Sequence, residues 1–274
     1  MSSAPLDAGT IDAGIIDVIN TTWGFINSPV NGCGSYLRLM KARSIDTSPP
    51  PSQPQVSDLA SASARWKLPA TLRWGFTAFM AVLVPIYWVH YGPANFLYFC
   101  DVALFLALAA VWTERPIYAS MAAVGVLVPQ LLWCVDLVLH LVGFNYAGMT
   151  NYMFDANKPL YLRLLSLFHG WLPFMLLFIV AKLGYDRRAL KAWTTVAVVL
   201  CLVGFFLLPA PGEVPAGSHD AVNVNYVYGI SETKAQTWMA PGLYLISWMV
   251  TLLVVCYLPA HAWLRARYGK DTRV

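Results

Sequence analysis

Charged residues are scarce in this sequence. Asp, Glu, Lys and Arg make up only 12% of its 274 residues, whereas 58% are hydrophobic. A soluble domain of this length carries about twice that charged fraction. The apolar residues also fall in long uninterrupted runs, which a globular core does not require. The composition excludes an ordinary soluble domain and predicts an all-α, polytopic membrane protein.

Motifs of several other protein classes are absent as well. No segment resembles a P-loop, a zinc finger or a dinucleotide-binding fingerprint. The five cysteines form no C-x-x-C pair and four of them lie in apolar runs, so no disulfide framework is expected. We predict no cofactor. The net charge of +4 requires no nucleic-acid partner, because basic residues that flank membrane spans account for it.

The first 65 residues differ in composition from the rest. Residues 44–57 are rich in Ser, Pro and Gln and cannot bury enough apolar surface to order themselves. The apolar patch at 11–26 is interrupted by Asp and Gly and lacks a basic segment before it, so it does not resemble a signal peptide. We expect residues 1–65 to be a disordered leader and residues 66–274 to form the membrane domain.

Six apolar segments in this second part are long enough to cross a bilayer core of about 30 Å at a rise of about 1.5 Å per residue. The sequence therefore predicts a six-helix transmembrane bundle. The expected spans are Leu68–Tyr91, Asn95–Trp112, Pro116–Val142, Tyr161–Leu183, Leu190–Leu208 and Pro241–Leu264.

Basic residues are distributed unequally around these spans. Twelve Lys and Arg residues lie on one side and three on the other. Loops with an excess of Lys and Arg stay in the cytoplasm. The sequence thus predicts an integral protein of the plasma or inner membrane with both termini in the cytoplasm.

With this orientation, the ionisable and polar residues of the spans gather in the outer half of the membrane. A charged group in lipid costs at least about 2.5–3.5 kcal/mol, so such residues indicate a functional site. We predict a single polar cavity that opens outward. Its expected residues are His90, Asn95, Tyr98, Cys100, Asp101, Gln130, Asp136, His140, Ser166, His169, Asn225 and Tyr226.

Four groups in this set are candidates for catalysis. His169 has the pKa of a general acid or base, although a histidine can also fix helix packing by hydrogen bonding. Cys100 is nucleophilic, although a lone membrane cysteine also serves as a small apolar filler. Asp136 and His140 are four residues apart and share a helix face, where they orient a catalytic group or cap the helix near the headgroups. Asp101 lies next to Cys100 and is included as a catalytic candidate.

Metal binding is an open alternative for the same residues. Together with His90, Asp101 and His169, the pair Asp136 and His140 would give enough nitrogen and oxygen ligands for a zinc-type hydrolase. The sequence contains neither H-x-x-x-H nor H-E-x-x-H. We therefore predict no metal ligands and keep a metal-dependent hydrolase as an alternative.

The remaining polar residues are predicted to bind the substrate. Asn95, Tyr98 and Gln130 lie on the expected spans, and Asn225 and Tyr226 lie in the loop before the last one. Asn95 or Asn225 would donate to an oxyanion. The two loop residues line the mouth of the cavity or anchor the loop at the membrane interface.

Several short motifs resemble the YwaF-like integral membrane proteins. They are Leu97-Tyr-Phe-Cys-Asp101, His169-Gly, Asn225-Tyr-Val-Tyr-Gly229 and Pro241-Gly-Leu-Tyr244. That family is in turn similar to androgen-induced-gene-type lipid hydrolases and to a transmembrane ether-phospholipid acyltransferase. The similarity extends from about Trp74 to His261.

The resemblance implies acyl transfer on lipids inside the membrane. His169 matches the family histidine, and Cys100 matches the cysteine of the acyltransferase and YwaF-like members. The hydrolase branch has a threonine as its nucleophile, and the alignment places Tyr98 at that position. This departure leaves the identity of the nucleophile open.

The sequence as a whole predicts a lipid ester hydrolase or acyltransferase whose partner is a membrane lipid. The rival is a membrane protein that binds or transports a small polar or amphipathic ligand without catalysis. Transporters usually carry polar residues in both halves of their spans, or broken helices in a repeated pair. Neither feature is visible in the sequence.

Overall fold

The computed structural model describes residues 67–144, 148–213, 221–231 and 234–269, and in these ranges it contains helices and no strand. The predicted leader, residues 1–65, lies outside the described residues. The long helices are α3 (Ala70–Tyr91), α4 (Phe99–Thr113), α5 (Pro116–Leu141), α8 (Phe168–Leu183), α9 (Ala189–Leu207), α10 (Pro241–Thr251) and α11 (Leu258–Tyr268). The all-α prediction is therefore confirmed for this part of the chain.

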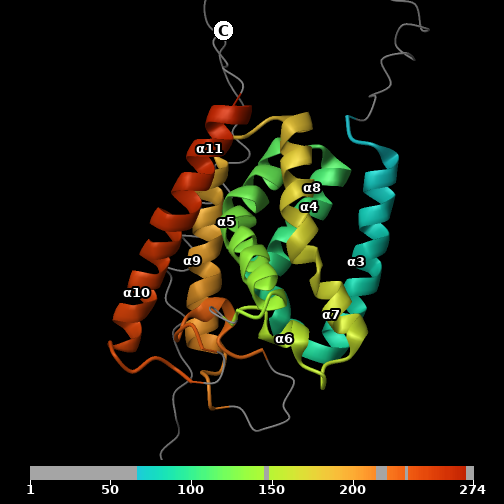
Figure 1. Ribbon diagram of the computed structural model, residues 1–274. Coiled ribbons are helices and arrows are strands. Elements are labelled where there is room, and N and C mark those ends of the chain that lie inside the picture. Colours follow the sequence, from blue (N-terminus) through green and yellow to red (C-terminus); the bar gives the residue numbers. More distant parts are fainter. Residues whose placement is uncertain (1–66, 145–147, 214–220, 232–233, 270–274) are drawn as a thin grey trace, which may run out of the picture. The chain divides into compact units, whose positions relative to one another are not determined.

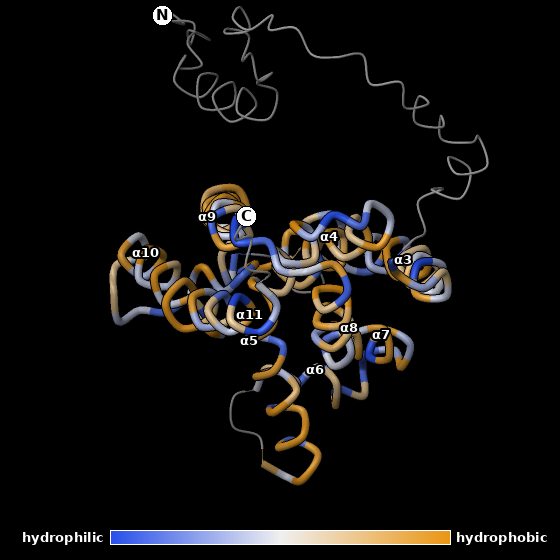
Figure 2. The backbone as a smooth tube through the Cα atoms, turned by 90° about the horizontal axis from the view of Figure 1, so that it is seen from above, coloured by the Kyte–Doolittle hydropathy of each residue, from blue (hydrophilic) through white to orange (hydrophobic). Residues whose placement is uncertain are grey.

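Five helical segments are long and apolar enough to cross a membrane. They are Ala70–Tyr91, Pro116–Leu141, Leu160–Leu183, Ala189–Leu207 and Pro241–Tyr268. Many large apolar side chains on them are exposed, such as Leu207 at 75% and Phe206 at 70%, and apolar colour covers much of the helical surface (Figure 2). This much exposed apolar surface would be unfavourable in water, so these helices indicate a membrane protein.

The second predicted span is shorter than expected. It consists of a 3₁₀-helix, η1 (Pro93–Leu97), followed by the 15-residue helix α4. Tyr98 separates them with the extended backbone angles φ −63° and ψ 141°. At about 1.5 Å per residue α4 spans about 22 Å, less than a bilayer core of about 30 Å. The structure thus gives five helices of spanning length, and α4 is an apolar helix below that length.

Helix α5 lies at the centre of the bundle. It packs against α4, α8 and α9, and against the last helical segment. Figure 1 shows α3 on one side of this central helix and α10 and α11 on the other. The residues from Ala119 to Leu127 are buried on every side of the helix, which is typical of a helix that forms the core of a bundle.

Close packing in this core depends on Gly125. A Cβ atom at Gly125 would lie 2.0 Å from Trp193 Cε2, because the fully buried indole of Trp193 on α9 rests directly on the glycine. Ala122 and Ala123 beside it are also fully buried. Small residues on α5 therefore let the neighbouring helices approach its backbone.

Two of the predicted spans are interrupted. The fourth contains α7 (Leu160–Ser166) and α8, which are separated at Leu167. The sixth contains α10, a π-helical stretch η3 (Leu252–Tyr257) and α11. Pro259 has no N–H to bond the carbonyl of Val255, and its ring crowds that carbonyl, so a widened turn just before it is expected.

Candidate functional site

The beginning of α4 holds a buried carboxylate. Asp101 is only 2% exposed, and its Oδ2 accepts a hydrogen bond from Asn95 Nδ2 at 3.3 Å. The Cys100 thiol donates to the same oxygen at 3.8 Å. The other oxygen, Oδ1, has no hydrogen-bond partner among the described residues. Three residues predicted for the site, Asn95, Cys100 and Asp101, are therefore in contact with one another.

The loop before the last span forms hydrogen bonds with the residues at the start of α4. Asn225 Oδ1 accepts from the Phe99 backbone N–H at 2.9 Å, and Asn225 Nδ2 donates to the Leu97 carbonyl at 2.9 Å. The Tyr98 hydroxyl donates to the Val222 carbonyl at 3.2 Å. Asn225 satisfies a free N–H at the start of α4 in this way. Its amide bonds to backbone at both ends, which accounts for its burial without a substrate.

The loop itself needs residues that accept left-handed backbone angles. Asn223, Asn225 and Tyr226 have φ values of 52°, 59° and 61°. Asparagine tolerates this region better than most residues. Asn223 Nδ2 also donates to the carbonyls of Gly229 and Ser231, at 2.8 and 3.0 Å. Tyr226 packs edge-on against Trp248 of α10 at 6.4 Å between ring centroids, so it lies against the last span.

Residues that the sequence analysis did not select lie beside Asp101. The Tyr87 hydroxyl of α3 is 3.0 Å from Ser166 Oγ, and it lies within electrostatic range of Asp101. The Tyr152 hydroxyl, on the short helix α6 (Asn151–Phe154), lies near Ser166, Trp133 and Cys100. A signal for Tyr87 existed, because it carries the polar atom at the end of a buried helical stripe that contains Met80 and Leu83.

A backbone carbonyl three residues earlier in the chain orients the His169 side chain. Its Nδ1 lies 2.8 Å from the Ser166 carbonyl, which can only accept, so Nδ1 carries the proton and Nε2 is free to accept one. The ring stacks on Trp133 of α5, with centroids 5.1 Å apart, and on Phe168 at 4.1 Å. Within the described residues His169 forms no hydrogen bond with Cys100.

Two more buried polar groups lie on α5. Gln130 is 2% exposed, and neither its Oε1 nor its Nε2 has a partner in the described part of the chain. Trp133, three residues on, is 4% exposed, and its indole interacts with the Tyr152 hydroxyl. Because α4 and α5 run antiparallel from the turn at Glu114, Gln130 lies at about the depth of Asp101. Buried polar atoms without partners are rare and each calls for a specific explanation.

We name these residues the polar cluster. They come from six different helices and from η1, and their contacts link α3, α4, α5, α7 and α8. Helices α6 and α7 lie at the end of the bundle opposite the C-terminal end of α11 (Figure 1). The members are Tyr87, Asn95, Cys100, Asp101, Gln130, Trp133, Tyr152, Ser166 and His169.

Asp136 and His140 both interact with Thr150. Asp136 Oδ2 accepts from the Thr150 backbone N–H at 2.9 Å and from the Thr150 hydroxyl at 2.8 Å. His140 Nδ1 lies 3.4 Å from the same hydroxyl, and its ring packs on Phe154 at 3.9 Å. Thr150 precedes α6, so this pair attaches the segment that carries Tyr152 to the end of α5. Hydrogen bonds within the protein account for the burial of Asp136.

The residues considered for the metal-dependent alternative do not form a cluster. His90 is at the surface and its Nε2 bonds to the Tyr161 hydroxyl at 2.8 Å. Among the described residues, no group of three or more His, Cys, Asp and Glu side chains is placed to hold a metal ion. The structure therefore adds no support to the metal-dependent alternative.

Comparisons with protein-family models, with curated proteins and with solved structures found no match to this chain.

Proposed function

We propose that this protein is a six-span membrane enzyme that hydrolyses a lipid ester or transfers its acyl group, with the polar cluster as its active site. The observation that carries the proposal is the buried Asp101 Oδ1, which has no partner among the described residues, while the Cys100 thiol donates to the other oxygen of the same carboxyl inside an apolar bundle. A buried carboxylate left partly unpaired costs stability. Such a cost is typical of sites that keep a polar group available for a ligand.

The six-span topology is part of this proposal. Helix α4 and η1 together would form the second span, with η1 in the headgroup region. The excess of Lys and Arg on one side of the spans supports cytoplasmic termini. The polar cluster then lies in the outer half of the membrane, where a lipid of that leaflet presents its ester groups.

Cys100 is the proposed nucleophile. Its Sγ would bond to the acyl carbon of the ester, while the thiol proton passes to an acceptor in the cluster. The bond from the acyl carbon to the lipid alcohol then breaks, and the alkoxide takes the proton. Water, or the hydroxyl of a second lipid, would release the acyl group from the thioester.

Two residues are placed to accept protons. Asp101 Oδ2 already accepts the hydrogen bond of the Cys100 thiol, which favours Asp101 as the first acceptor. His169 has an unprotonated Nε2 and no bond to Cys100, which favours a role in activating the water or alcohol of the second step.

The oxyanion donors differ from those expected. Asn95 donates to Asp101, and Asn225 bonds to backbone. Gln130 Nε2 is a buried donor without a partner in the described part of the chain, and it is the better candidate to bind the carbonyl oxygen of the ester.

The test uses the full chain in nanodiscs and a phospholipid with a fluorescent ester-linked acyl chain. We expect release of the fluorescent acid, a loss of about 10²-fold or more in Cys100→Ala, and a smaller loss in His169→Gln. Asp101→Asn should slow formation of the thioester, detected as the acyl mass on the peptide that contains Cys100. Cys256→Ala, which removes a buried thiol of η3, is the matched control.

Equal activity in Cys100→Ala and the wild type would refute the proposed nucleophile. If the protein retains the lipid at a stoichiometric level and no acyl group is ever released, the non-catalytic alternative is correct, and the polar cluster binds an amphipathic ligand without turnover.

A further inference from the structure

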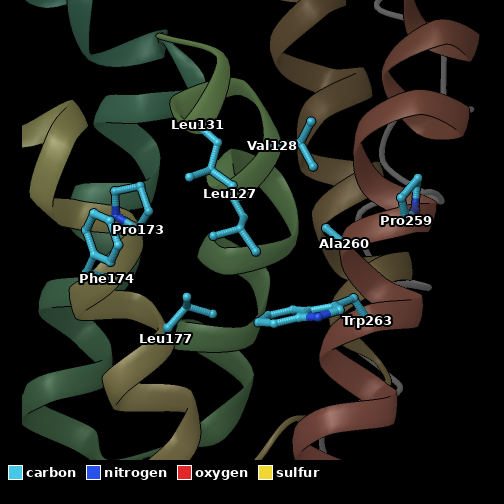
Figure 3. A pocket seen from close by; sticks show the side chains of 9 residues that line it. All are labelled: Leu127, Val128, Leu131, Pro173, Phe174, Leu177, Pro259, Ala260 and Trp263. Carbon is cyan, nitrogen blue, oxygen red and sulfur yellow. The ribbon is translucent and has the colours of Figure 1, made fainter. Parts of the chain in front are cut away.

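An apolar groove crosses the bundle away from the buried core. It has a volume of about 400 Å³ and lies between α5, α8 and α11. Figure 3 shows Leu177 of α8 and Trp263 of α11 on opposite sides of it, with Leu127 of α5 above the gap between them. The lining side chains are Leu127, Val128, Leu131, Pro173, Phe174, Leu177, Pro259, Ala260 and Trp263.

A second hollow lies farther along the same faces of α8 and α11. It has a volume of about 430 Å³ and is lined by Ala181, Gly184, Arg267, Tyr268 and Gly269. On α8 the lining positions 173, 177, 181 and 184 are spaced by three or four residues, and so are 260, 263 and 267 on α11. Positions with this spacing share one face of a helix. We name the two hollows together the α8–α11 furrow.

The lining of the furrow changes from apolar to basic along its length. Its first part is lined by apolar side chains, and its last part contains the guanidinium of Arg267, which is exposed and rests on the ring of Tyr268 at 5.5 Å. Arg267 has no carboxylate partner in the described ranges. The nearby Asp186 is already paired with Arg188 at 2.8 Å. A backbone bond from Tyr185 N to Tyr268 O at 3.2 Å joins the two sides at this end.

The dimensions match one leaflet. From Pro173 to Gly184 a helix rises about 16 Å, which is about half of a bilayer core of about 30 Å. An acyl chain that fills the apolar part would thus bring a phosphate to the level of Arg267. The cation lies at the end of the bundle where Lys182 is also exposed, so the potential there favours an anionic headgroup.

We propose that the α8–α11 furrow is a binding site for one anionic phospholipid of the leaflet at the C-terminal end of α11. One acyl chain lies between Leu177 and Trp263, and the phosphate pairs with Arg267. This site is separate from the polar cluster, and its lipid is a resident ligand and not the substrate.

The test measures lipid retained by the purified full-length protein. The protein is equilibrated with equal amounts of phosphatidylglycerol and phosphatidylcholine, and the bound lipids are quantified by native mass spectrometry. We expect one retained phosphatidylglycerol per chain and clear preference over phosphatidylcholine. Arg267→Gln should weaken retention about fivefold, the effect of one cation at a membrane surface. Leu177→Trp, at a partly exposed position, should fill the furrow and reduce retention at least as much.

Arg265→Gln is the matched control, because it removes the same charge from the same helix at a position that does not line the furrow. We expect it to retain the lipid as the wild type does. Equal loss in Arg265→Gln and Arg267→Gln would overturn the site in favour of general surface attraction. Equal retention of the two lipids, or retention unaffected by Leu177→Trp, would also overturn it, the former indicating that the furrow does not select an anionic headgroup.

Discussion

The two halves of α5 on either side of Pro129 differ in how much they bury and in which side chains they bury. The first half, from Ala119 to Leu127, is enclosed on all sides by apolar neighbours. Its one polar side chain, Ser120, is paired, since its Oγ accepts from the Asp186 backbone N–H at 3.0 Å. The second half turns Gln130, Trp133 and Asp136 inward and exposes its leucines and valines.

This difference separates a structural region from a candidate functional one. In the first half the packing is complete and its polar atom is paired, so substitutions there should reduce stability first. In the second half both polar atoms of Gln130 are unpaired among the described residues, whereas Asp136 and His140 interact with Thr150. A fold that needed only stability would replace the unpaired groups with apolar ones.

The largest effect is expected at Gly125. In Gly125→Ala the new methyl group would collide with the Trp193 indole, which has no space to move within a fully buried contact. Overpacking of this kind costs about 3 kcal/mol or more. The thermal unfolding midpoint of the protein in nanodiscs should fall strongly, and little folded protein should be recovered.

Gly75→Ala is the control for that substitution, because nothing lies within 4 Å of a Cβ at Gly75 and both glycines are in membrane helices. We expect it to be neutral or slightly stabilising. Equal unfolding midpoints for the two variants would show that α5 is not packed as tightly as described.

A smaller effect is expected at Thr150, which forms hydrogen bonds with the second half of α5. Thr150→Val keeps the volume of the side chain but removes the hydroxyl that bonds to Asp136 and approaches His140. The loss of a hydrogen bond to a buried carboxylate should cost about 1.5–3 kcal/mol in the free energy of unfolding. Hydrogen exchange should increase in α6. Exchange that stays at the wild-type level in α6 would contradict the attachment role of Asp136.

The smallest effect is expected at the surface loop between α8 and α9. The Arg188 guanidinium donates to Asp186 and lowers the pKa of that carboxyl below its ordinary value of about 3.9. A lowered pKa means that the stabilisation is present above about pH 4 and is lost as the pH falls through the folded-state value. Asp186→Asn should therefore cost at most about 1 kcal/mol at pH 7, and the difference from wild type should shrink as the pH falls below about 4. A difference that stays the same there would contradict the ion pair.

The arrangement of the long helices could be predicted from the sequence because lipid imposes length and composition on a span. Pro116–Leu141 and Ala189–Leu207 begin and end within one residue of the predicted bounds. The break at Tyr98 could not be predicted in this way. It depends on Asn225, which lies more than 120 residues away and bonds to both Leu97 and Phe99.

The candidate site was predictable in part for the same reason. A buried carboxylate at Asp101 and an imidazole at His169 are costly in lipid, so their presence alone indicated a site. Tyr152 gave no such signal, because tyrosine is common at membrane interfaces. Tyr87 gave only the weaker signal of its place on a buried helical stripe. Their part in the cluster depends on how α3 and α6 pack. Asp136 indicated a site for the same reason, but in the structure its carboxylate is hydrogen-bonded to Thr150.

The account is tested most directly by the unfolding midpoint of Gln130→Leu in nanodiscs. Leucine has a similar volume and no polar atoms, so it removes two unpaired buried groups without opening a cavity. If Gln130 is kept for a substrate and not for the fold, the midpoint should rise by about 2–6 °C. A fall of similar size would show that Gln130 stabilises the bundle, and that result would contradict the distinction between the two halves of α5.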